Sequence, residues 1–162
     1  MTHTSSVTSS TATAQDCKLP IVRTHQDYQV YRISPEDRNR LAILFDPKTA
    51  DVALTSCVEI FDVGGRTPSH RHNAAIEMFY VLKGRGEARC DGKVVPLQTG
   101  DSILIPNSGT HELRNTGSDR LYVLCIMVPN EDFAELIRNG IPDELDDEDR
   151  RVLNRTDALV SC

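Results

Sequence analysis

Tryptophan is absent from this 162-residue chain, and the other aromatic residues are few. No apolar run in it approaches the roughly 20 residues that a helix needs to cross a bilayer. The first residues also lack a basic segment followed by an apolar core, which is the pattern of a secretory signal. We therefore expect no membrane partner and a cytoplasmic location.

Closely spaced cysteine pairs of the CxxC type are absent too. The chain has an odd number of cysteines, which are Cys17, Cys57, Cys90, Cys125 and Cys162. This pattern predicts free thiols in a reducing cytoplasm and argues against a disulfide framework. Three of them, Cys57, Cys90 and Cys125, fall in strand-like runs and are interpreted most simply as small buried hydrophobic residues.

A basic stripe is missing as well, although the chain is rich in charge. Its formal charge is -6, and nine of its 24 acidic residues lie between 131 and 149, against one base, Arg138. The rest of the chain is nearly balanced, so a nucleic-acid partner is not expected. The acidic segment is interpreted as the solvated face of a helical region.

Changes in composition divide the chain into three parts. Residues 1–18 are rich in Ser and Thr and are predicted to be a disordered tail. Residues 19–129 are predicted to form one domain, in which short strands are separated by turn signals such as Asp91-Gly92. Residues 130–162 form a C-terminal appendage whose apolar residues recur at helical spacing.

The strand-like runs of the middle part are short and numerous. They are 28–33, 40–45, 52–61, 69–72, 77–82, 86–90, 93–97, 102–105, 111–115 and 121–128. A helix-start signature from Ser34 to Asp37 predicts a short helical turn, and Asp46-Pro47-Lys48 is typical of a turn. Many short strands at this spacing predict an all-β fold, either a closed barrel or a two-sheet jelly roll.

Two short helices are predicted in the appendage, one within 130–140 and one from near 143 or 146 to about 154. They would cover an outer face of the barrel or an edge strand. The run 121–128, LYVLCIMV, is apolar on both faces, as a strand covered on both sides should be. Either the C-terminal helices or a second subunit could supply this cover, and we expect a homodimer.

Three histidines and one glutamate carry the chemistry of the chain. His70 and His72 are two residues apart, so both imidazoles point the same way if the segment is extended. Glu77 begins the strand-like run EMFYVL, and His111 begins another alternating run. A lone His-x-His is more often a polar surface pair, but the four residues together predict a site for a divalent transition metal.

The spacing of these residues resembles the two sequence motifs of the cupin superfamily. The first motif is matched by Gly64, His70, His72, Glu77 and Gly84. The second motif is matched by Gly100, Pro106, His111 and Asn115. Ser108 stands where the family usually has a glycine, a difference that affects a loop and leaves the ligand set intact.

The resemblance implies a double-stranded β-helix, the cupin barrel or jelly roll with a cup-shaped interior. His70, His72, Glu77 and His111 would bind one divalent ion in the cup. Three imidazoles and one carboxylate leave two positions open on an octahedral ion, a site that suits Fe, Mn, Ni or Cu. Zinc with four protein ligands is usually tetrahedral and closed, so it ranks lower for activity.

An open metal site in a cup predicts an enzyme that acts on a small organic molecule. The first hypothesis is a dioxygenase-type oxidoreductase. Glu77 could act there as a catalytic base, by resemblance to flavonol-cleaving cupins with the same ligand set. A lyase, decarboxylase or isomerase would use the same site without dioxygen. The alternative from another class is a small-molecule-binding sensor without turnover.

Strand alternation predicts the wall of the cup. Phe79 and Val81 should share the face of Glu77, which would make the cup partly apolar. Tyr80 should point away from it. Arg66 is either an anion contact at the rim or a solvated loop side chain.

Overall fold

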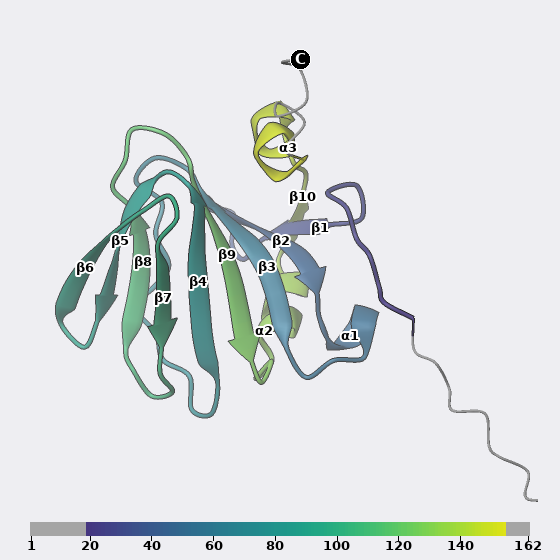
Figure 1. Cartoon of the computed structure of the whole chain (residues 1–162), viewed down its shortest axis with the longest axis horizontal. Helices are drawn as coiled ribbons and strands as arrows, with labels where there is room; N and C mark the ends of the chain where they lie inside the picture. Colours follow the sequence, from purple (N-terminus) through teal and green to yellow (C-terminus); the bar gives the residue numbers. More distant parts are fainter. Residues whose placement is uncertain (1–18, 155–162) are drawn as a thin grey trace, which may run out of the picture.

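This computed structural model describes residues 19–154, which contain ten short strands and three short helices (Figure 1). Seven strands form the larger sheet in the order β10-β1-β2-β3-β9-β4-β7, and three form the smaller sheet in the order β6-β5-β8. The predicted disordered tail, residues 1–18, lies outside the described residues.

The larger sheet consists of β1 (Gln29–Arg32), β2 (Asn39–Phe45), β3 (Thr55–Phe61), β4 (Ile76–Lys83), β7 (Ser102–Ile105), β9 (Leu121–Val128) and β10 (Ile141–Asp143). The smaller sheet consists of β5 (Arg85–Cys90), β6 (Lys93–Gln98) and β8 (His111–Asn115). The helices are α1 (Pro47–Ala50), α2 (Phe133–Arg138) and α3 (Asp147–Asn154).

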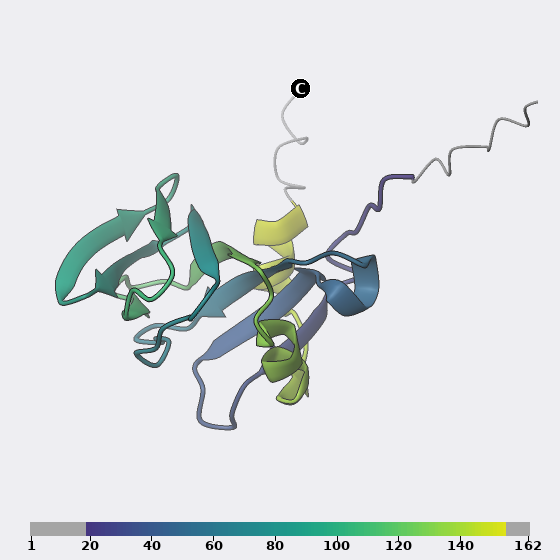
Figure 2. The same cartoon turned by 90° about the horizontal axis from the view of Figure 1, so that it is seen from below.

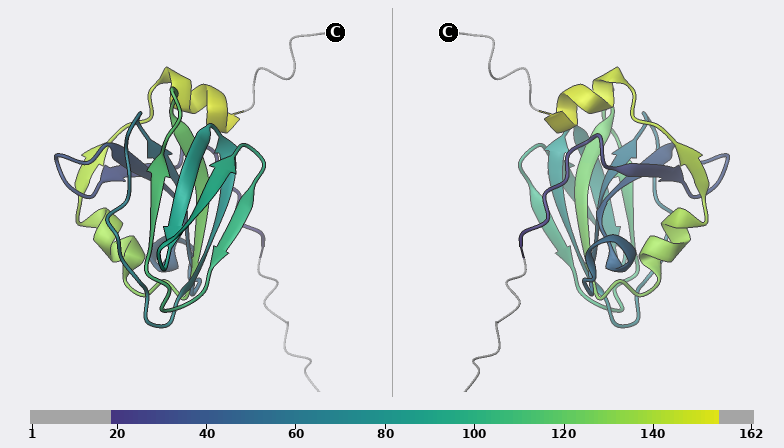
Figure 3. Two further views of the ribbon diagram at one scale, coloured as in Figure 1. Left: turned by 90° about the vertical axis from the view of Figure 1, so that its left-hand side faces the viewer. Right: turned by 90° about the vertical axis from the view of Figure 1, so that its right-hand side faces the viewer.

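The two sheets lie against each other (Figures 2 and 3). Buried side chains from both sheets form the core between them. Strand β4 alternates between buried and more exposed residues, so Phe79 and Val81 point inward while Tyr80 lies on the outer face. Leu113 of the smaller sheet joins Phe79 and Val81 in the same buried cluster. The predicted all-β jelly roll is confirmed.

One predicted strand is absent among the described residues. The backbone of residues 69–72 pairs with β8 only through an isolated bridge between His70 and His111. A second bridge joins Arg66 to Arg114. Pro68 lies between these two bridges and has no N–H to donate to a continuous ladder. The segment is therefore an extended loop held at two points, and it still carries both histidines into the barrel.

The short connections also differ from the prediction. Ser34 to Asp37 forms a hydrogen-bonded turn without becoming helical, with the Asp37 N–H 3.2 Å from the Ser34 carbonyl oxygen. Conversely, the expected turn after Asp46 winds into the single helical turn α1, because the Asp46 side chain caps the N–H of Thr49.

The C-terminal region is more closely tied to the barrel than predicted. Between the two predicted helices lies β10, which was not predicted and pairs with β1. Asp149 of α3 is fully buried, and its carboxylate lies 2.6 Å from Arg40 Nη1 and accepts a hydrogen bond from the Tyr122 hydroxyl. The interpretation of the acidic segment as a solvated face is therefore wrong at this position, because Asp149 joins the helix to β2 and β9.

Part of the outer face of the larger sheet remains apolar and exposed. Tyr122 is buried together with Leu145 and Val152 of the C-terminal region, but Leu104 is 60% exposed. Exposed apolar side chains also occur nearby on β4 and β9, at Ile76, Tyr80 and Val128. Homodimerisation through this face stays a prediction, which sedimentation across micromolar concentrations tests.

No helix of residues 19–154 has the length and apolar character to span a membrane.

Candidate metal centre

Nitrogen and oxygen atoms from four side chains converge inside the barrel. Nε2 of His111 lies 2.9 Å from Oε2 of Glu77, and Nε2 of His72 lies 3.3 Å from the same oxygen. His70 completes the group, whose potential ligand atoms all lie within 4.8 Å of one another. Glu77 comes from β4 of the larger sheet and His111 from β8 of the smaller sheet, so the centre bridges the two layers. The structure thus brings together all four residues that the sequence predicts as ligands.

Backbone carbonyls fix the orientation of two of the imidazoles. Nδ1 of His111 donates to the Gly109 carbonyl at 2.9 Å, and Nδ1 of His70 donates to the Pro68 carbonyl at 2.9 Å. A carbonyl oxygen can only accept, so each Nδ1 carries a proton, and Nε2 is the nitrogen that faces the cluster. This is the outer hydrogen bond that metal-binding histidines usually make.

Glu77 is ionised despite its burial. Burial alone would raise the pKa of Glu77, but hydrogen bonds from His111, His72 and Cys125 outweigh this effect and hold the pKa at about 2. The Cys125 thiol lies 3.1 Å from Oε1, the oxygen that does not face the histidines. Burial raises the pKa of the Cys125 thiol well above its ordinary value, so it stays protonated and donates. The interpretation of Cys125 as merely a small buried hydrophobe therefore misses a role.

The surroundings of the cluster also shift the pKa values of His70 and His111. Burial lowers the pKa of His70 and favours its neutral form. Burial also opposes the charged form of His111, but the hydrogen bonds to Glu77 and Gly109 outweigh it, and the pKa of His111 is raised. Three imidazole nitrogens and an anionic oxygen fit a divalent transition metal, which would take the place of the proton between His111 and Glu77.

The loop between His72 and Glu77 is held in place from outside the barrel. The Glu131 carboxylate accepts the N–H groups of Asn73, Ala74 and Ala75 at 2.8 to 3.1 Å. These bonds lower the pKa of Glu131. The sequence placed Glu131 only among the solvated acids of residues 131–149, and only the folded chain brings it beside this loop.

A second backbone contact positions the loop that precedes His111. Ser108 donates its N–H to the His72 carbonyl at 2.8 Å and has a φ angle of +66°. A positive φ favours glycine, which explains why the cupin motif usually has one at this position. Asn115 of the second motif has a structural role, because its Nδ2 donates to the backbone carbonyls of Phe61, Asp62 and Asp119.

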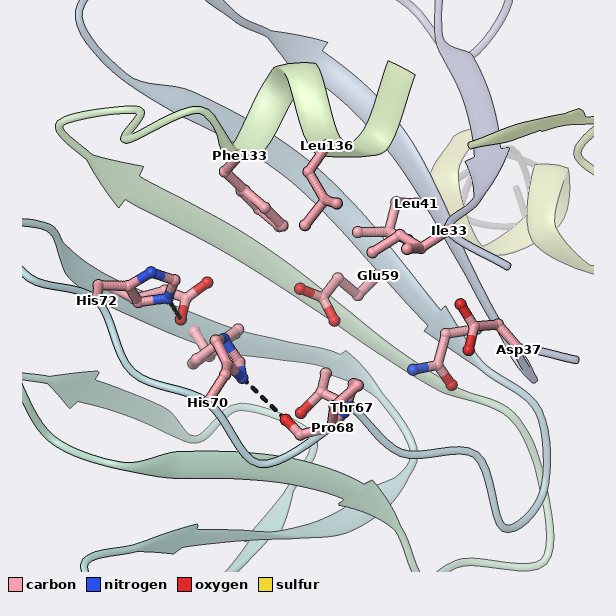
Figure 4. A pocket seen from close by; sticks show the side chains of 13 residues that line it. Ile33, Asp37, Leu41, Glu59, Thr67, Pro68, His70, His72, Phe133 and Leu136 are labelled. Carbon is pink, nitrogen blue, oxygen red and sulfur yellow. Dashed lines mark hydrogen bonds and ion pairs between the residues drawn. The ribbon is translucent and has the colours of Figure 1, made fainter. Parts of the chain in front are cut away.

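A mostly apolar cavity of about 220 Å³ opens beside the cluster (Figure 4). Its walls include Ile33, Leu41, Phe79, Phe133 and Leu136. As predicted, β4 contributes Phe79 to this wall. The α2 side chains were not predicted there, because the appendage was expected to cover the outside of the barrel.

Arg66 does not belong to this cavity. Its side chain is exposed and borders a separate surface depression with Glu36 and Arg38. Of the two alternatives for Arg66, the structure supports the solvated loop side chain.

Glu59 is an unpredicted polar residue of the cavity wall. It lies on the inward face of β3, is only 4% exposed, and has its carboxyl oxygens directed toward the side of His70 and His72 (Figure 4). Burial, together with repulsion from Glu77, raises its pKa to about 8. One signal in the sequence could have identified it, since Glu59 is the single charged residue of the strand TSCVEIF.

Known proteins provide an independent comparison. Residues 57–127 match the family described as the cupin domain. An uncharacterised protein of Methanocaldococcus jannaschii is 30% identical over 115 residues, which cover 68% of this chain and 89% of that protein. The oxalate-binding protein of Thermotoga maritima is 31% identical over 65 residues, but the match covers 40% of this chain and 54% of that protein.

Solved structures agree on the fold. A predicted oxalate decarboxylase from Thermotoga maritima superposes with a TM-score of 0.61 at 23% identity, covering 67% of this chain and 99% of that one. KdgF from a Halomonas species superposes with a TM-score of 0.59 at 22% identity, covering 72% of this chain and 99% of that one. At this level of identity the likeness concerns the barrel alone.

Proposed function

This chain is a member of the cupin superfamily, and we propose that it is a mononuclear metal-dependent enzyme acting on a small oxygenated organic molecule, with dioxygen as second substrate. The observation that carries the proposal is the convergence of His70, His72, Glu77 and His111 beside a mostly apolar cavity. A cluster serving only the fold would need no such cavity at its open side.

The protein's own residues would bind and shield the substrate. The four ligands would hold one divalent ion, which supplies Lewis-acid polarisation and access to dioxygen chemistry when it is bound. Phe79, Phe133 and Leu136 would exclude water from the cavity. Glu77 would hold the negative charge of the ligand set, and its release from that set would make it a base.

A non-oxidative reaction is the second candidate, and Glu59 favours it. A carboxyl group whose pKa is about 8 carries its proton at neutral pH, so it can give that proton to a substrate atom. A decarboxylase, lyase or isomerase needs such a proton donor. Binding without turnover is the third candidate, favoured by the name of the Thermotoga maritima oxalate-binding protein, and a ligand recovered unchanged would support it.

Metal content measured by mass spectrometry, on protein purified without an affinity metal column, tests the metal-binding part of the proposal. We expect near-stoichiometric Fe, Mn, Ni or Cu in the wild type and none in His72→Ala. A wild type that holds no metal and takes up none on reconstitution would refute the proposal.

Oxygen-electrode measurements with 2-oxo acids, diketones and catechols then separate the reaction classes. We expect oxygen consumption that depends on both the metal and the substrate. Equal product formation in the absence of oxygen would remove the dioxygenase and leave the non-oxidative enzyme.

A further inference from the structure

Glu59 has no evident structural role. The residue is only 4% exposed and its carboxyl faces the cavity, yet among residues 19–154 no group donates a hydrogen bond to it, and only burial and the charge of Glu77 act on its pKa. Burying an unpartnered polar group destabilises a fold. The barrel would therefore be more stable with an apolar residue here, which indicates that the carboxyl serves something other than folding.

The position of Glu59 relates it directly to the metal centre. Its carboxyl oxygen lies within 4.8 Å of the Cys125 thiol, and that thiol lies 3.1 Å from Oε1 of Glu77. Strand β9 is the single strand between β3 and β4, so both glutamates belong to the inward face of the same sheet. A molecule of a few carbon atoms can therefore reach from the metal centre to Glu59.

The cavity between them limits the size and polarity of that molecule. Its volume of about 220 Å³ is below the range of roughly 300–1,000 Å³ usual for drug-sized ligands. Leu41, Phe79 and Leu136 line the same cavity as Glu59 with apolar surface, so the middle of the ligand should be apolar. Burial of the Glu59 side chain favours its neutral carboxylic acid form, which donates a hydrogen bond that an oxygen atom of the ligand would accept.

We propose that Glu59 is the second anchor of the cavity, binding an acceptor oxygen of a short oxo acid or diketone whose other end occupies the metal centre. This inference rests on the proposed function, because it needs a metal at His70, His72, Glu77 and His111. It concerns ligand recognition and is independent of whether the reaction uses dioxygen.

The test compares two probes that differ in one carbonyl group. Both 2-oxohexanoate and 2,5-dioxohexanoate offer the same carboxylate and 2-oxo group to the metal, but only the second has an oxygen near the end of its chain. Binding to the Mn(II)-reconstituted protein is measured by calorimetry at pH 7. We expect the wild type to bind the dioxo acid about fivefold to tenfold more tightly, the size of one hydrogen bond.

Substitutions at Glu59 decide whether this preference comes from its carboxyl. Glu59→Gln keeps a donor and should keep the preference, whereas Glu59→Leu should bind both probes equally with unchanged Mn content. Glu87 lies in β5 of the smaller sheet, on the face opposite to the buried Gly86 and Ala88. Glu87→Leu is therefore the matched control and should behave like the wild type. If Glu59→Leu does not fold, as judged by circular dichroism, Glu59→Met replaces it.

The outcomes separate this inference from the proposed function. A wild type without preference, or an unchanged preference in Glu59→Leu or Glu59→Met, would overturn the second anchor while leaving the metal enzyme intact. Failure of the wild type to take up Fe, Mn, Ni or Cu would overturn both, whereas failure of the Mn-loaded wild type to bind either probe would overturn the second anchor alone. Loss of the preference in Glu59→Leu, with normal Mn content, would support the second anchor.

Discussion

Glu59 and Glu77 lie on the same inward sheet face, and both are almost fully buried, yet their pKa values are moved in opposite directions. The pKa of Glu77 is held at about 2, and that of Glu59 is raised to about 8. The difference lies in their partners. Glu77 accepts hydrogen bonds from His72, His111 and Cys125, while none of the described residues donates to Glu59.

A surface carboxylate shows that partners, more than burial, set the direction of these shifts. Glu131 accepts three backbone N–H groups from the loop before Glu77, and its pKa is lowered although it lies at the surface. Three donors thus keep a carboxyl ionised both outside and inside the barrel. In the metal-free protein the cavity consequently has an anionic glutamate at the metal centre and a neutral one facing it.

The same substitution at the two buried glutamates should give the largest contrast. Glu77→Gln removes the anionic ligand, so we expect the affinity for Mn(II) to fall by more than the roughly 100-fold that outer-shell substitutions can cost. Glu59→Gln should leave metal affinity within a factor of about two, since Glu59 is not a ligand. Metal titration followed by electron paramagnetic resonance measures both. Equal losses in the two variants would contradict the assignment of separate roles.

The two glutamates should change the free energy of unfolding of the metal-free protein in opposite directions as the pH rises. The raised pKa of Glu59 means that the folded protein retains a proton that the unfolded chain loses above its ordinary pKa of 4.5. Stability from this group is present below pH 4.5 and is lost as the pH rises toward 8. The lowered pKa of Glu77 has the opposite effect, with stability lost as the pH falls from 4.5 toward 2.

Urea unfolding between pH 3 and 9 measures this profile. The slope from Glu59 is at most about 1.4 kcal/mol per pH unit, so a few kcal/mol should be lost between pH 5 and 8. The difference between the wild type and Glu59→Gln isolates this group from His70 and His111, whose titrations are common to both proteins. Parallel profiles for the two proteins would contradict the raised pKa.

Glu131 provides a smaller effect on the metal centre from outside the barrel. Glu131→Gln replaces one carboxylate oxygen by an NH2 group, which cannot accept, so at least one of the bonds from Asn73, Ala74 and Ala75 is lost and the loop between His72 and Glu77 should loosen. We expect metal affinity to fall about tenfold, the lower range for an outer contact. Asp132→Asn removes a neighbouring charge without touching the loop and serves as the control. Similar affinities in both variants would show that the loop holds its position without Glu131.

The parts of this molecule that the sequence predicted are those set by short-range spacing. His70 and His72 lie close together in the chain, Glu77 begins a strand with clear alternation, and the turn signals define the sheet strands. Even the failed strand at 69–72 did not displace the ligands, because two bridges to β8 replace the ladder. The metal cluster therefore follows from local pattern combined with the barrel topology.

The parts that the sequence did not predict depend on contacts between distant segments. Asp149 looked like one of many solvated acids until α3 placed it on Arg40, and Glu131 gained its role from a loop nearly 60 residues away. Glu59 could not be identified from a contact, since its significance lies in the lack of hydrogen-bond donors around its carboxyl. Counting donors around a carboxyl requires coordinates.

Substitutions at Cys125 should give the smallest change in the pKa difference between Glu77 and Glu59. Cys125→Ala removes one of the three donors to Glu77 and so makes Glu77 slightly more like Glu59, whereas Cys125→Ser keeps a donor. A thiol is a weak donor, so metal affinity should fall about tenfold or less in Cys125→Ala. Acid unfolding of the metal-free protein should begin at a higher pH in Cys125→Ala than in the wild type, because the pKa of Glu77 rises. If Cys125→Ala and Cys125→Ser unfold alike in acid, the thiol contributes only packing, and the two histidines alone keep Glu77 ionised.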